Sequence, residues 1–377
     1  MEEKYDVAYC PCADYEYNTV KTALETVIDR TLPDGRLRPG MRAALKLNLV
    51  AGAEPEKAAT VHPTVVLALK NILTQRGLMV VAGDSPGGPF SRLWVERIYA
   101  ACGLAELREQ GLVLNEDFEE LHIDKPAGAI CHAFDCTAYL KKADIIINVC
   151  KLKTHGMMTQ TSGVKNMFGS IPGTKKQEQH FRYARHEDFA DMLVDLYEYF
   201  SPALTICDAV VAMEGNGPTA GRPRKAGYLA AAVNAHALDE SLARLIGAAP
   251  AEIPTLAAAS RRGLLPRTPR IWGEPSPILD FEKPRASGLL FEGQGKGLSV
   301  WRSRLFAAVF RTRPRLTRKR CVGCAQCARV CPAKAIVMKD GCPVINRKSC
   351  IRCFCCQEFC PQGALYVHRS AVARWLQ

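Results

Sequence analysis

Residues 321–332 read CVGCAQCARVCP, and residues 350–361 read CIRCFCCQEFCP. In each stretch four cysteines follow the spacing C-x2-C-x2-C-x3-C, and a proline comes directly after the last one. This spacing is typical of the 4Fe–4S-binding runs of bacterial two-cluster ferredoxins, in which the fourth cysteine of each run binds the cluster of the other run. The proline prevents the chain from continuing as a helix and fixes the turn beside that fourth ligand.

The two runs therefore predict two 4Fe–4S clusters, each held by three cysteines of one run and one cysteine of the other. Zinc and disulfide bonds are the alternatives, but zinc sites seldom use two such closely spaced sets of four cysteines. Two clusters imply that the protein handles electrons. The expected ligands are Cys321, Cys324, Cys327 and Cys360 for one cluster, and Cys350, Cys353, Cys356 and Cys331 for the second.

A chain of 377 residues is long enough for two or three domains. Its composition, with 48% hydrophobic and 23% charged residues, is that of a soluble globular protein. The first residues are acidic where a signal peptide would be basic, and no segment reaches the roughly 18 apolar residues that cross a membrane. We therefore expect no membrane span and a location in a reducing cytoplasm. The cysteines outside the two runs have no partner spacing and are expected to be buried thiols.

The positive charge of the chain is concentrated in one segment. Residues 261–320 contain fifteen Lys or Arg and four Asp or Glu, an excess of eleven in a chain of net charge +12. The segment offsets the negative charge of the clusters, docks an acidic redox partner protein, or forms a solvated linker. Nucleic-acid binding is not expected, because the basic residues lack an accompanying aromatic surface or a known motif.

Residues 143–150 read ADIIINVC, which is typical of a buried strand. Other strands and helices alternate around it, which predicts an α/β domain with an open, mostly parallel sheet and helices on both faces. A small α+β two-cluster ferredoxin-like domain is expected after it. The further strands are predicted at residues 42–50, 78–82, 203–208 and 228–233, and the helices at 63–75, 188–200 and 237–246.

These patterns divide the chain into three parts. The α/β domain is expected over residues 1–250 and the ferredoxin domain over 317–377. Between them, residues 251–316 are rich in Pro, Gly and Arg and are interpreted as a basic linker or arm. Within that arm, residues 301–311 predict a short amphipathic helix that packs on the protein itself.

Polar side chains follow the predicted strands, at the edge where open α/β sheets bind ligands. Lys151, Lys153 and His155 come directly after the clearest strand, and their positive charge suits a phosphate or carboxylate, with a solvated loop as the alternative. Asp208 and Glu214 follow a later strand and are candidates for a general base or for divalent-metal ligands. These five are the candidate catalytic residues.

A second set of residues is expected to bind a cofactor or substrate. The loop at 83–88 reads GDSPGG, and its backbone N–H groups suit an anion, although an ordinary tight turn gives the same pattern. Residues 163–176 carry Gly, Lys and Asn and are expected to form a loop that covers a substrate. His180, just beyond, is expected to be structural. The candidates for binding are Lys46, Asn48, Gly83, Asp84, Ser85, Lys165 and Asn166.

Five short motifs occur in a recognisable order. They are KLNL at 46–49, GDSP at 83–86, KLKTH at 151–155, KNMFG at 165–169 and AMEGNGP at 212–218. Together they resemble the family called domain of unknown function 362, which is often fused to a C-terminal two-cluster ferredoxin module. The resemblance covers roughly residues 5–245 and 317–368 and implies an iron–sulfur protein, without supplying a reaction. The family usually has proline where this chain has Leu47 and Cys150.

We therefore expect an iron–sulfur redox protein. Its ferredoxin module would relay single electrons to or from an anionic small-molecule or cofactor site on the α/β domain. Whether the protein is an enzyme stays open, and an iron–sulfur oxidoreductase is the class considered. Two alternatives remain: an electron carrier whose α/β domain docks a protein partner, and a maturation or ligase-type enzyme with structural clusters, which no Walker motif supports.

Overall fold

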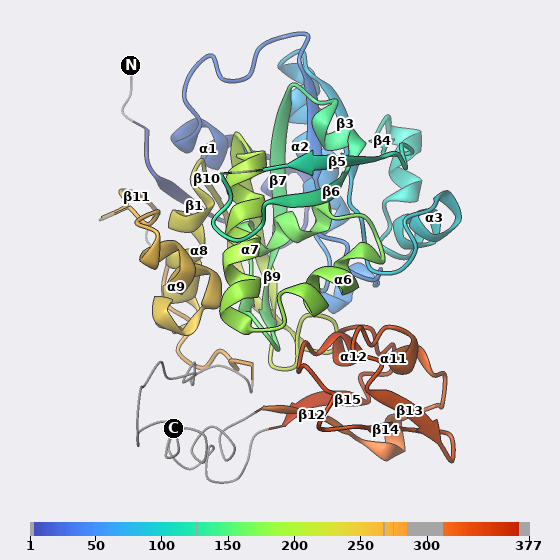
Figure 1. Cartoon of the computed structure of the whole chain (residues 1–377). Helices are drawn as coiled ribbons and strands as arrows, with labels where there is room; N and C mark the ends of the chain where they lie inside the picture. The colour runs from blue at the N-terminus through green and yellow to red at the C-terminus, as the bar shows by residue number, and fades with distance from the viewer. Residues whose placement is uncertain (1–3, 126, 267, 274, 285–311, 369–377) are drawn as a thin grey trace.

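A computed structural model describes residues 4–125, 127–266, 268–273, 275–284 and 312–368 (Figure 1). The chain forms an α/β domain around a central sheet and a small cysteine-rich module, which lies below α6 (Lys175–Arg182) in the view of Figure 1. The helix predicted at residues 301–311 lies outside the described residues. None of the helices in the described part of the chain has the length and apolar character needed to cross a membrane.

The central sheet is mostly parallel, which confirms the predicted α/β class. Its strand order is β11-β1-β10-β9-β7-β2-β3-β4, and the short β8 pairs with β7. Neighbouring strands run parallel from β9 through β7, β2 and β3 to β4, whereas β10 pairs antiparallel with both β9 and β1. The strands are β1 (Val7–Pro11), β2 (Arg42–Lys46), β3 (Met79–Gly83), β4 (Val113–Leu114), β7 (Ile145–His155), β8 (Thr159–Thr161), β9 (Leu204–Glu214), β10 (Arg222–Ala232) and β11 (Ile271–Trp272).

Helices cover both faces of the sheet, as the alternating pattern predicts. Side chains alternate along a strand, so the neighbours Ala44 and Leu45 in β2 belong to cores on opposite faces. One core packs under α1, α2 and α3, and the other face packs under α7, α8 and α9. These helices are α1 (Tyr17–Thr31), α2 (Pro63–Gln75), α3 (Arg92–Ala101), α7 (His186–Phe200), α8 (Ala235–Leu245) and α9 (Pro254–Arg261).

Three strands extend further than the sequence predicts. β7 continues beyond Cys150 to His155, β9 continues to Glu214, and β10 already begins at Arg222. Charged residues flank each apolar run, and polarity alone places the strand ends beside them. In β7 and β9 these charged side chains are buried with partners inside the domain, so both strands continue where polarity predicts a loop.

The segment at 163–176 is not the loop that the sequence predicts. It begins with α5 (Gly163–Asn166), continues as a 3-10 turn at Met167–Ser170 and ends in α6. The carboxylate of Asp239 in α8 accepts the backbone N–H groups of Gly163 at 2.7 Å and of Val164 at 3.0 Å. A helix start held by a buried carboxylate from a distant helix has no local sequence signal.

The described part of the predicted basic arm packs on the α/β domain. Residues 254–261 form α9, which lies against α7, and β11 pairs parallel with β1 at the edge of the sheet. Phe281 is buried in the core beneath α8. Residues 285–311 lie outside the described residues.

The C-terminal module has a small sheet region and two short helices. β12 (Arg313–Leu316) pairs antiparallel with β15 (Leu365–His368), and β13 (Ile336–Lys339) forms a hairpin with β14 (Cys342–Ile345). The helices α11 (Gln326–Arg329) and α12 (Cys355–Glu358) each lie within one cysteine run. Figure 1 shows both helices on the side of the module that faces the α/β domain.

Candidate functional site

The cysteines of the module surround two separate cavities. One cavity is lined by Cys321, Cys324, Cys327 and Cys360, and the other by Cys331, Cys350, Cys353 and Cys356. Each set therefore combines three cysteines of one run with the last cysteine of the other. Apolar side chains such as Leu316, Met338 and Ile336 complete the linings. Four thiols in an apolar setting fit the donor set of a 4Fe–4S cluster.

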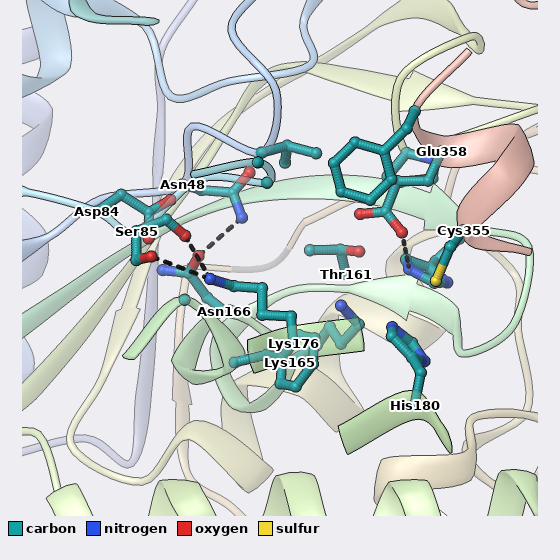
Figure 2. Close-up of a pocket in the computed structure, with 18 of the residues that line it drawn as sticks. Asn48, Asp84, Ser85, Thr161, Lys165, Asn166, Lys176, His180, Cys355 and Glu358 are labelled. Carbon is teal, nitrogen blue, oxygen red and sulfur yellow. Dashed lines mark hydrogen bonds and ion pairs between the residues drawn. The ribbon is translucent and has the colours of Figure 1, made fainter. Parts of the chain in front are cut away.

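A third cavity, of about 650 Å³ including its open mouth, lies between the module and the α/β domain (Figure 2). Its α/β wall comes from the ends of β2, β3 and β7 and from α5 and α6, which is the edge where open α/β sheets bind ligands. Its other wall is α12 of the module. We call this cavity the interface pocket. The polar or aromatic residues that line it include Asn48, Asp84, Ser85, Lys153, His155, Lys165, Lys176, His180, Cys355, Glu358 and Phe359.

Behind the pocket, Lys46 and Asp84 form a buried ion pair. Nζ of Lys46 lies 2.9 Å from Oδ1 of Asp84, and the second carboxylate oxygen accepts the N–H of Leu49 at 2.8 Å. A Cβ atom at Gly169 would overlap both charged groups, so glycine is required where the 165–169 motif crosses the pair. The charge of Asp84 is thereby balanced, and Lys46 supports the pocket without lining it.

Two asparagines connect this support to the pocket. Nδ2 of Asn166 donates to Oδ1 of Asn148 at 2.7 Å, and its Oδ1 accepts from Nδ2 of Asn48 at 2.7 Å. The amide oxygen of Asn48 in turn accepts a hydrogen bond from Nζ of Lys153 at 2.7 Å. Asn48 and Asn166 therefore hold a lysine in place, and their hydrogen-bonding groups are largely used by the protein itself.

Lys153 is the buried cation that this network positions. Its Nζ also donates to the carbonyl of Ala59 at 2.6 Å, which leaves one N–H free among the described residues. Burial lowers the pKa of Lys153 to about 7, although the carboxylate of Glu358 works in the opposite direction. The ammonium group is therefore close to titrating at neutral pH.

Lys165 and Lys176 reach the pocket from α5 and α6. Among the described residues Lys165 makes no hydrogen bond, and its Nζ lies 5.1 Å from the centre of the Phe168 ring. Burial lowers the pKa of Lys165, and it lowers the pKa of Lys176 to about 7. Lys176 donates to the carbonyl of Ser85 at 2.7 Å, to its hydroxyl at 3.2 Å and to the carbonyl of Ile171. Lys176 is thus committed to the protein, whereas Lys165 is available to a ligand.

His155 presents a fixed hydrogen-bond donor to the pocket. Its Nδ1 accepts the backbone N–H groups of Met157 and Met158, both at 3.1 Å, so the proton of the neutral ring must be on Nε2. Nε2 lies 3.9 Å from a carboxylate oxygen of Glu358, which is too long for a hydrogen bond. Burial, followed by the nearby charge of Lys165, lowers the pKa of His155 well below its usual value. The ring is therefore neutral.

His180, which the sequence analysis took as structural, also faces the pocket (Figure 2). Its ring stacks on Phe189 with the ring centres 4.3 Å apart, and burial lowers its pKa to about 3. Its Nδ1 is buried without a hydrogen-bond partner among the described residues. The ring is neutral and anchored by its stacking contact.

Lys151 and Asp208 lie together, but away from the interface pocket. Nζ of Lys151 is 2.8 Å from Oδ2 of Asp208 and 2.7 Å from the hydroxyl of Tyr15. The same carboxylate accepts the Tyr15 hydroxyl proton at 2.8 Å and the backbone N–H of His62 at 3.0 Å. Both charged side chains are buried and mutually satisfied, so the structure places them in a support role rather than at the pocket.

Glu214 and Gly83 also lie outside the pocket lining. Glu214 pairs with Arg222 at 3.1 Å and accepts the N–H of Glu282 at 3.0 Å. It is six residues from Asp208 on the extended β9, a separation of about 20 Å, so these two carboxylates do not share a metal site. Gly83 ends β3, and a Cβ atom there would collide with Asn115.

The loop at 83–88 contributes to the site in a different way from the predicted one. The N–H of Ser85 donates to the carbonyl of Gly169 at 3.3 Å, and the N–H of Gly87 donates to the carbonyl of Val50, so neither is free for an anion. At Gly87 a Cβ atom would overlap the ring of Phe359. Glycine at position 87 therefore allows Phe359 of the module to pack against the α/β domain.

Further contacts hold α12 against the α/β domain. Nε2 of Gln357 donates to Oδ1 of Asn216 at 2.8 Å and to the carbonyl of Gly217 at 3.0 Å. The hydroxyl of Thr219 donates to the carbonyl of Glu358 at 2.8 Å. These bonds give the 212–218 motif a structural role, because it holds α12 against the α/β domain.

Residues 43–244 match the family described as Domain of unknown function (DUF362). The chain belongs to this family. Residues 313–361 match the 4Fe-4S dicluster domain, so the predicted fusion of the two is confirmed. The five motifs that carried the resemblance lie around the interface pocket or behind it, which gives this DUF362 chain a physical reason for its sequence pattern.

A relative and two solved structures are similar to this DUF362 protein. The thylakoid-associated protein sll1697 of Synechocystis sp. is 33% identical over 262 residues, which cover 67% of this chain and 78% of that protein. The lactate racemase apoprotein of Thermoanaerobacterium thermosaccharolyticum superposes with a TM-score of 0.37 at 9% identity, over 59% of this chain and 53% of that one. A Thermotoga maritima protein gives 0.33 at 11%, over 52% and 51%. The chain thus spans about half the length of each solved structure.

Sequence reasoning missed the module side of the pocket. Cys355, Glu358 and Phe359 lie inside the second cysteine run, where the spacing indicates only a cluster site. One signal was available: Glu358 is the only glutamate among residues 312–368, in a module rich in Lys and Arg. An isolated acidic residue within a cluster-binding run is unexpected unless another part of the molecule uses it.

Proposed function

We propose that this protein relays single electrons through two 4Fe–4S clusters to or from an anionic small molecule bound in the interface pocket. The match to the dicluster domain supports iron–sulfur electron transfer by the module. The observation that carries the proposal is that residues of the second cysteine run form one wall of the pocket. Cys355, Glu358 and Phe359 line it, and they lie between the proposed cluster ligands Cys353 and Cys360.

The two cysteine sets described above would hold the clusters, which supply one-electron chemistry when bound. The set with Cys331, Cys350, Cys353 and Cys356 includes residues on and beside α12, so it adjoins the pocket. The other set includes Cys324, which is exposed, next to the exposed Arg318, Lys319 and Arg320. A redox partner protein with an acidic surface would exchange electrons there.

The charge of the pocket favours an anion. Three lysines line it, and the only carboxylate there without a cationic partner is Glu358, because Asp84 is balanced by Lys46. Buried positive charge attracts an anionic ligand more strongly than the same charge at the surface would. The many free thiols suit the reducing cytoplasm expected from the sequence.

The same groups would stabilise a ligand that gains an electron. Reduction adds negative charge to the bound molecule. The available N–H groups of Lys153, Lys165 and His155 already point toward that region, so they stabilise the added charge without reorganisation. His155 acts as a neutral donor in this scheme, and Lys151 and Asp208 act only through the stability of the sheet.

A ligand-binding measurement on the anaerobically prepared, cluster-loaded full chain tests the proposal. Glycolate and inorganic phosphate are titrated by calorimetry, and the electron paramagnetic resonance spectrum of the reduced clusters is recorded with and without each. We expect saturable binding and an altered spectrum. Lys165→Met should weaken binding at least tenfold, since it removes a charged hydrogen-bond donor. Lys348→Met, on an exposed part of the module, is the matched control.

Binding that is lost equally in both variants, or that leaves the cluster spectrum unchanged, would count against the relay. In that case the protein would act as an electron carrier whose α/β domain docks a partner, the reading favoured by the exposed basic residues beside Cys324. Electron transfer by such a carrier should slow steeply with added salt.

A further inference from the structure

The available polar groups of the interface pocket divide into two unlike sets. On the α/β side, Lys165 donates to no described residue, Lys153 keeps one N–H after bonding Asn48 and Ala59, and Nε2 of His155 is buried without an acceptor. His155 is 2% exposed and Lys165 is 9% exposed, so bulk water does not satisfy these donors. This wall therefore offers buried, unused N–H groups.

The opposite wall offers an acceptor. The carboxylate of Glu358 projects from α12 into the pocket (Figure 2), and its side chain is only 16% exposed. Among the described residues its carboxylate makes no ion pair within 4.0 Å with Lys153 or Lys165, and the nearest cationic or imidazole nitrogen is Nε2 of His155 at 3.9 Å. Burial lowers the pKa of Lys153 and of Lys165, and among the neighbouring charges Glu358 opposes this effect most strongly.

The carboxylate of Glu358 and the ammonium groups of Lys153 and Lys165 are close enough to interact electrostatically but too far apart to form ion pairs. A gap therefore remains between the two walls of the pocket. A largely buried carboxylate without a hydrogen-bond donor is costly, and so is a buried ammonium without an acceptor. One ligand that spans the gap relieves both costs at once. It needs acceptor oxygens at the end facing the lysines and a donor at the end facing Glu358.

We propose that the interface pocket binds a small molecule with two unlike ends. One end is an oxyanion, carboxylate or phosphate, held by Lys153, Lys165 and His155. The other end is a hydroxyl or amino group that donates a hydrogen bond to Glu358. This inference rests on the proposed function, because it takes the interface pocket as the ligand site.

The two-ended geometry also orients the ligand relative to the clusters. Glu358 lies between the proposed ligands Cys356 and Cys360, on the wall that belongs to the module. The hydroxyl- or amino-bearing end of the ligand is therefore turned toward the cluster-bearing segment, and the oxyanion is turned toward the sheet. Glu358 is a specificity-determining residue in this arrangement.

Matched pairs of probes test the inference on the cluster-loaded full chain. Glycolate is compared with acetate, and phosphoethanolamine with ethyl phosphate, by calorimetric titration without oxygen. The first member of each pair has the donor and the second lacks it. We expect the donor-bearing member to bind at least tenfold more tightly in at least one pair, and that pair shows whether the oxyanion is a carboxylate or a phosphate.

Variants at Glu358 assign the preference to this residue. Glu358→Ala should bring the affinity ratio of the pair close to one, while the donor-free probe binds as tightly as before or more tightly, because a repelling charge is gone. Glu358→Gln keeps an acceptor oxygen and should keep part of the preference. Asp340→Asn, in the exposed turn between β13 and β14, is the matched control. Cluster absorbance and circular dichroism establish that each variant is folded.

Two results would overturn the inference in different ways. Equal affinities within both pairs in the wild type, or a preference that Glu358→Ala leaves intact, would remove the role of Glu358 and leave the anion site in place. Failure of all four probes to bind a fully loaded wild type would overturn the proposed function together with the inference.

Discussion

Two lysines that are two residues apart in β7 have different tasks. Lys151 and Lys153 point to the same side of the strand, yet Lys151 is paired with Asp208 and Tyr15, whereas Lys153 bonds only neutral oxygens and lines the pocket. Burial lowers the pKa of Lys153 to about 7, so its charge responds to pH near neutrality.

Anion binding should therefore weaken as the pH rises through 7. Lys153 is charged below its lowered pKa of about 7 and neutral above it, and the charged groups that face it are Glu358, Lys165, Lys151 and Asp84. Between pH 6 and pH 8 we expect sulfate, whose own charge is constant over this range, to lose affinity about tenfold. Calorimetric titration at several pH values measures the change.

Lys153→Met serves as the control for this pH effect. The variant should bind sulfate weakly at both ends of the range and show a flatter profile. Lys176, whose pKa is also about 7, accounts for the slope that remains. A profile as steep in Lys153→Met as in the wild type would show that another group titrates.

At the scale of elements, α12 has two partners with different requirements. Its cysteines belong to the cluster-binding run, while Gln357, Glu358 and Phe359 contact the α/β domain or line the pocket. A helix of four residues has no stability of its own, so its position depends on these contacts. Small changes at the contact surface should therefore move the pocket wall.

Gly87→Ala tests this dependence. The added Cβ overlaps the Phe359 ring, so α12 has to shift, and overpacking of this kind costs about 1–3 kcal/mol. We expect weaker glycolate binding and faster amide hydrogen exchange in residues 353–360. Phe359→Ala introduced into the same chain removes the collision and should restore slow exchange. If Gly87→Ala exchanges as slowly as the wild type, the contact does not hold the helix.

At the same scale, the sequence predicted elements well and their ends poorly. Apolar runs such as ADIIINVC identified the parallel strands, because burial on both faces leaves a direct composition signal. The extension of β7 through Lys151 and Lys153 could not be predicted, because it depends on Asp208 and Asn48, which are far away along the chain. Propensity describes only local preferences, and these partners are tertiary.

The same reasoning explains what was predicted of the site. Lys153, His155, Lys165, Asn48 and Asp84 were recognised because polar groups after strands converge at one sheet edge. Which of these groups keep an unused donor at the pocket, and which are held by other residues of the protein, can be decided only from the hydrogen bonds. The module wall was missed because no local pattern indicates that a cluster-binding run also closes a pocket on another domain.

For the whole molecule, the fusion makes the cysteine-rich module one wall of the proposed binding site. Removal of iron by an oxidant and a chelator should disorder the cysteine runs, which contain one wall of the pocket. We expect glycolate affinity to fall at least tenfold in the cluster-free protein and to return on reconstitution. Calorimetry before and after reconstitution measures this.

Far-ultraviolet circular dichroism provides the control for cluster removal, since the α/β domain should keep its secondary structure. Unchanged affinity in a protein shown to lack iron would mean that the α/β domain binds the anion by itself. The pocket wall on α12 would then be a neighbour of the site rather than part of it.

The strand order of the central sheet also determines when the pocket is assembled as the chain is synthesised. β1 pairs with β10 and β11, so the sheet is complete only after residues 271–272 have left the ribosome, and the cysteine runs follow later still. N-terminal domains generally fold first on the nascent chain. The lysine-bearing wall therefore forms before α12 exists, and under the proposed function a newly made α/β domain would be exposed to its anion before the clusters are in place.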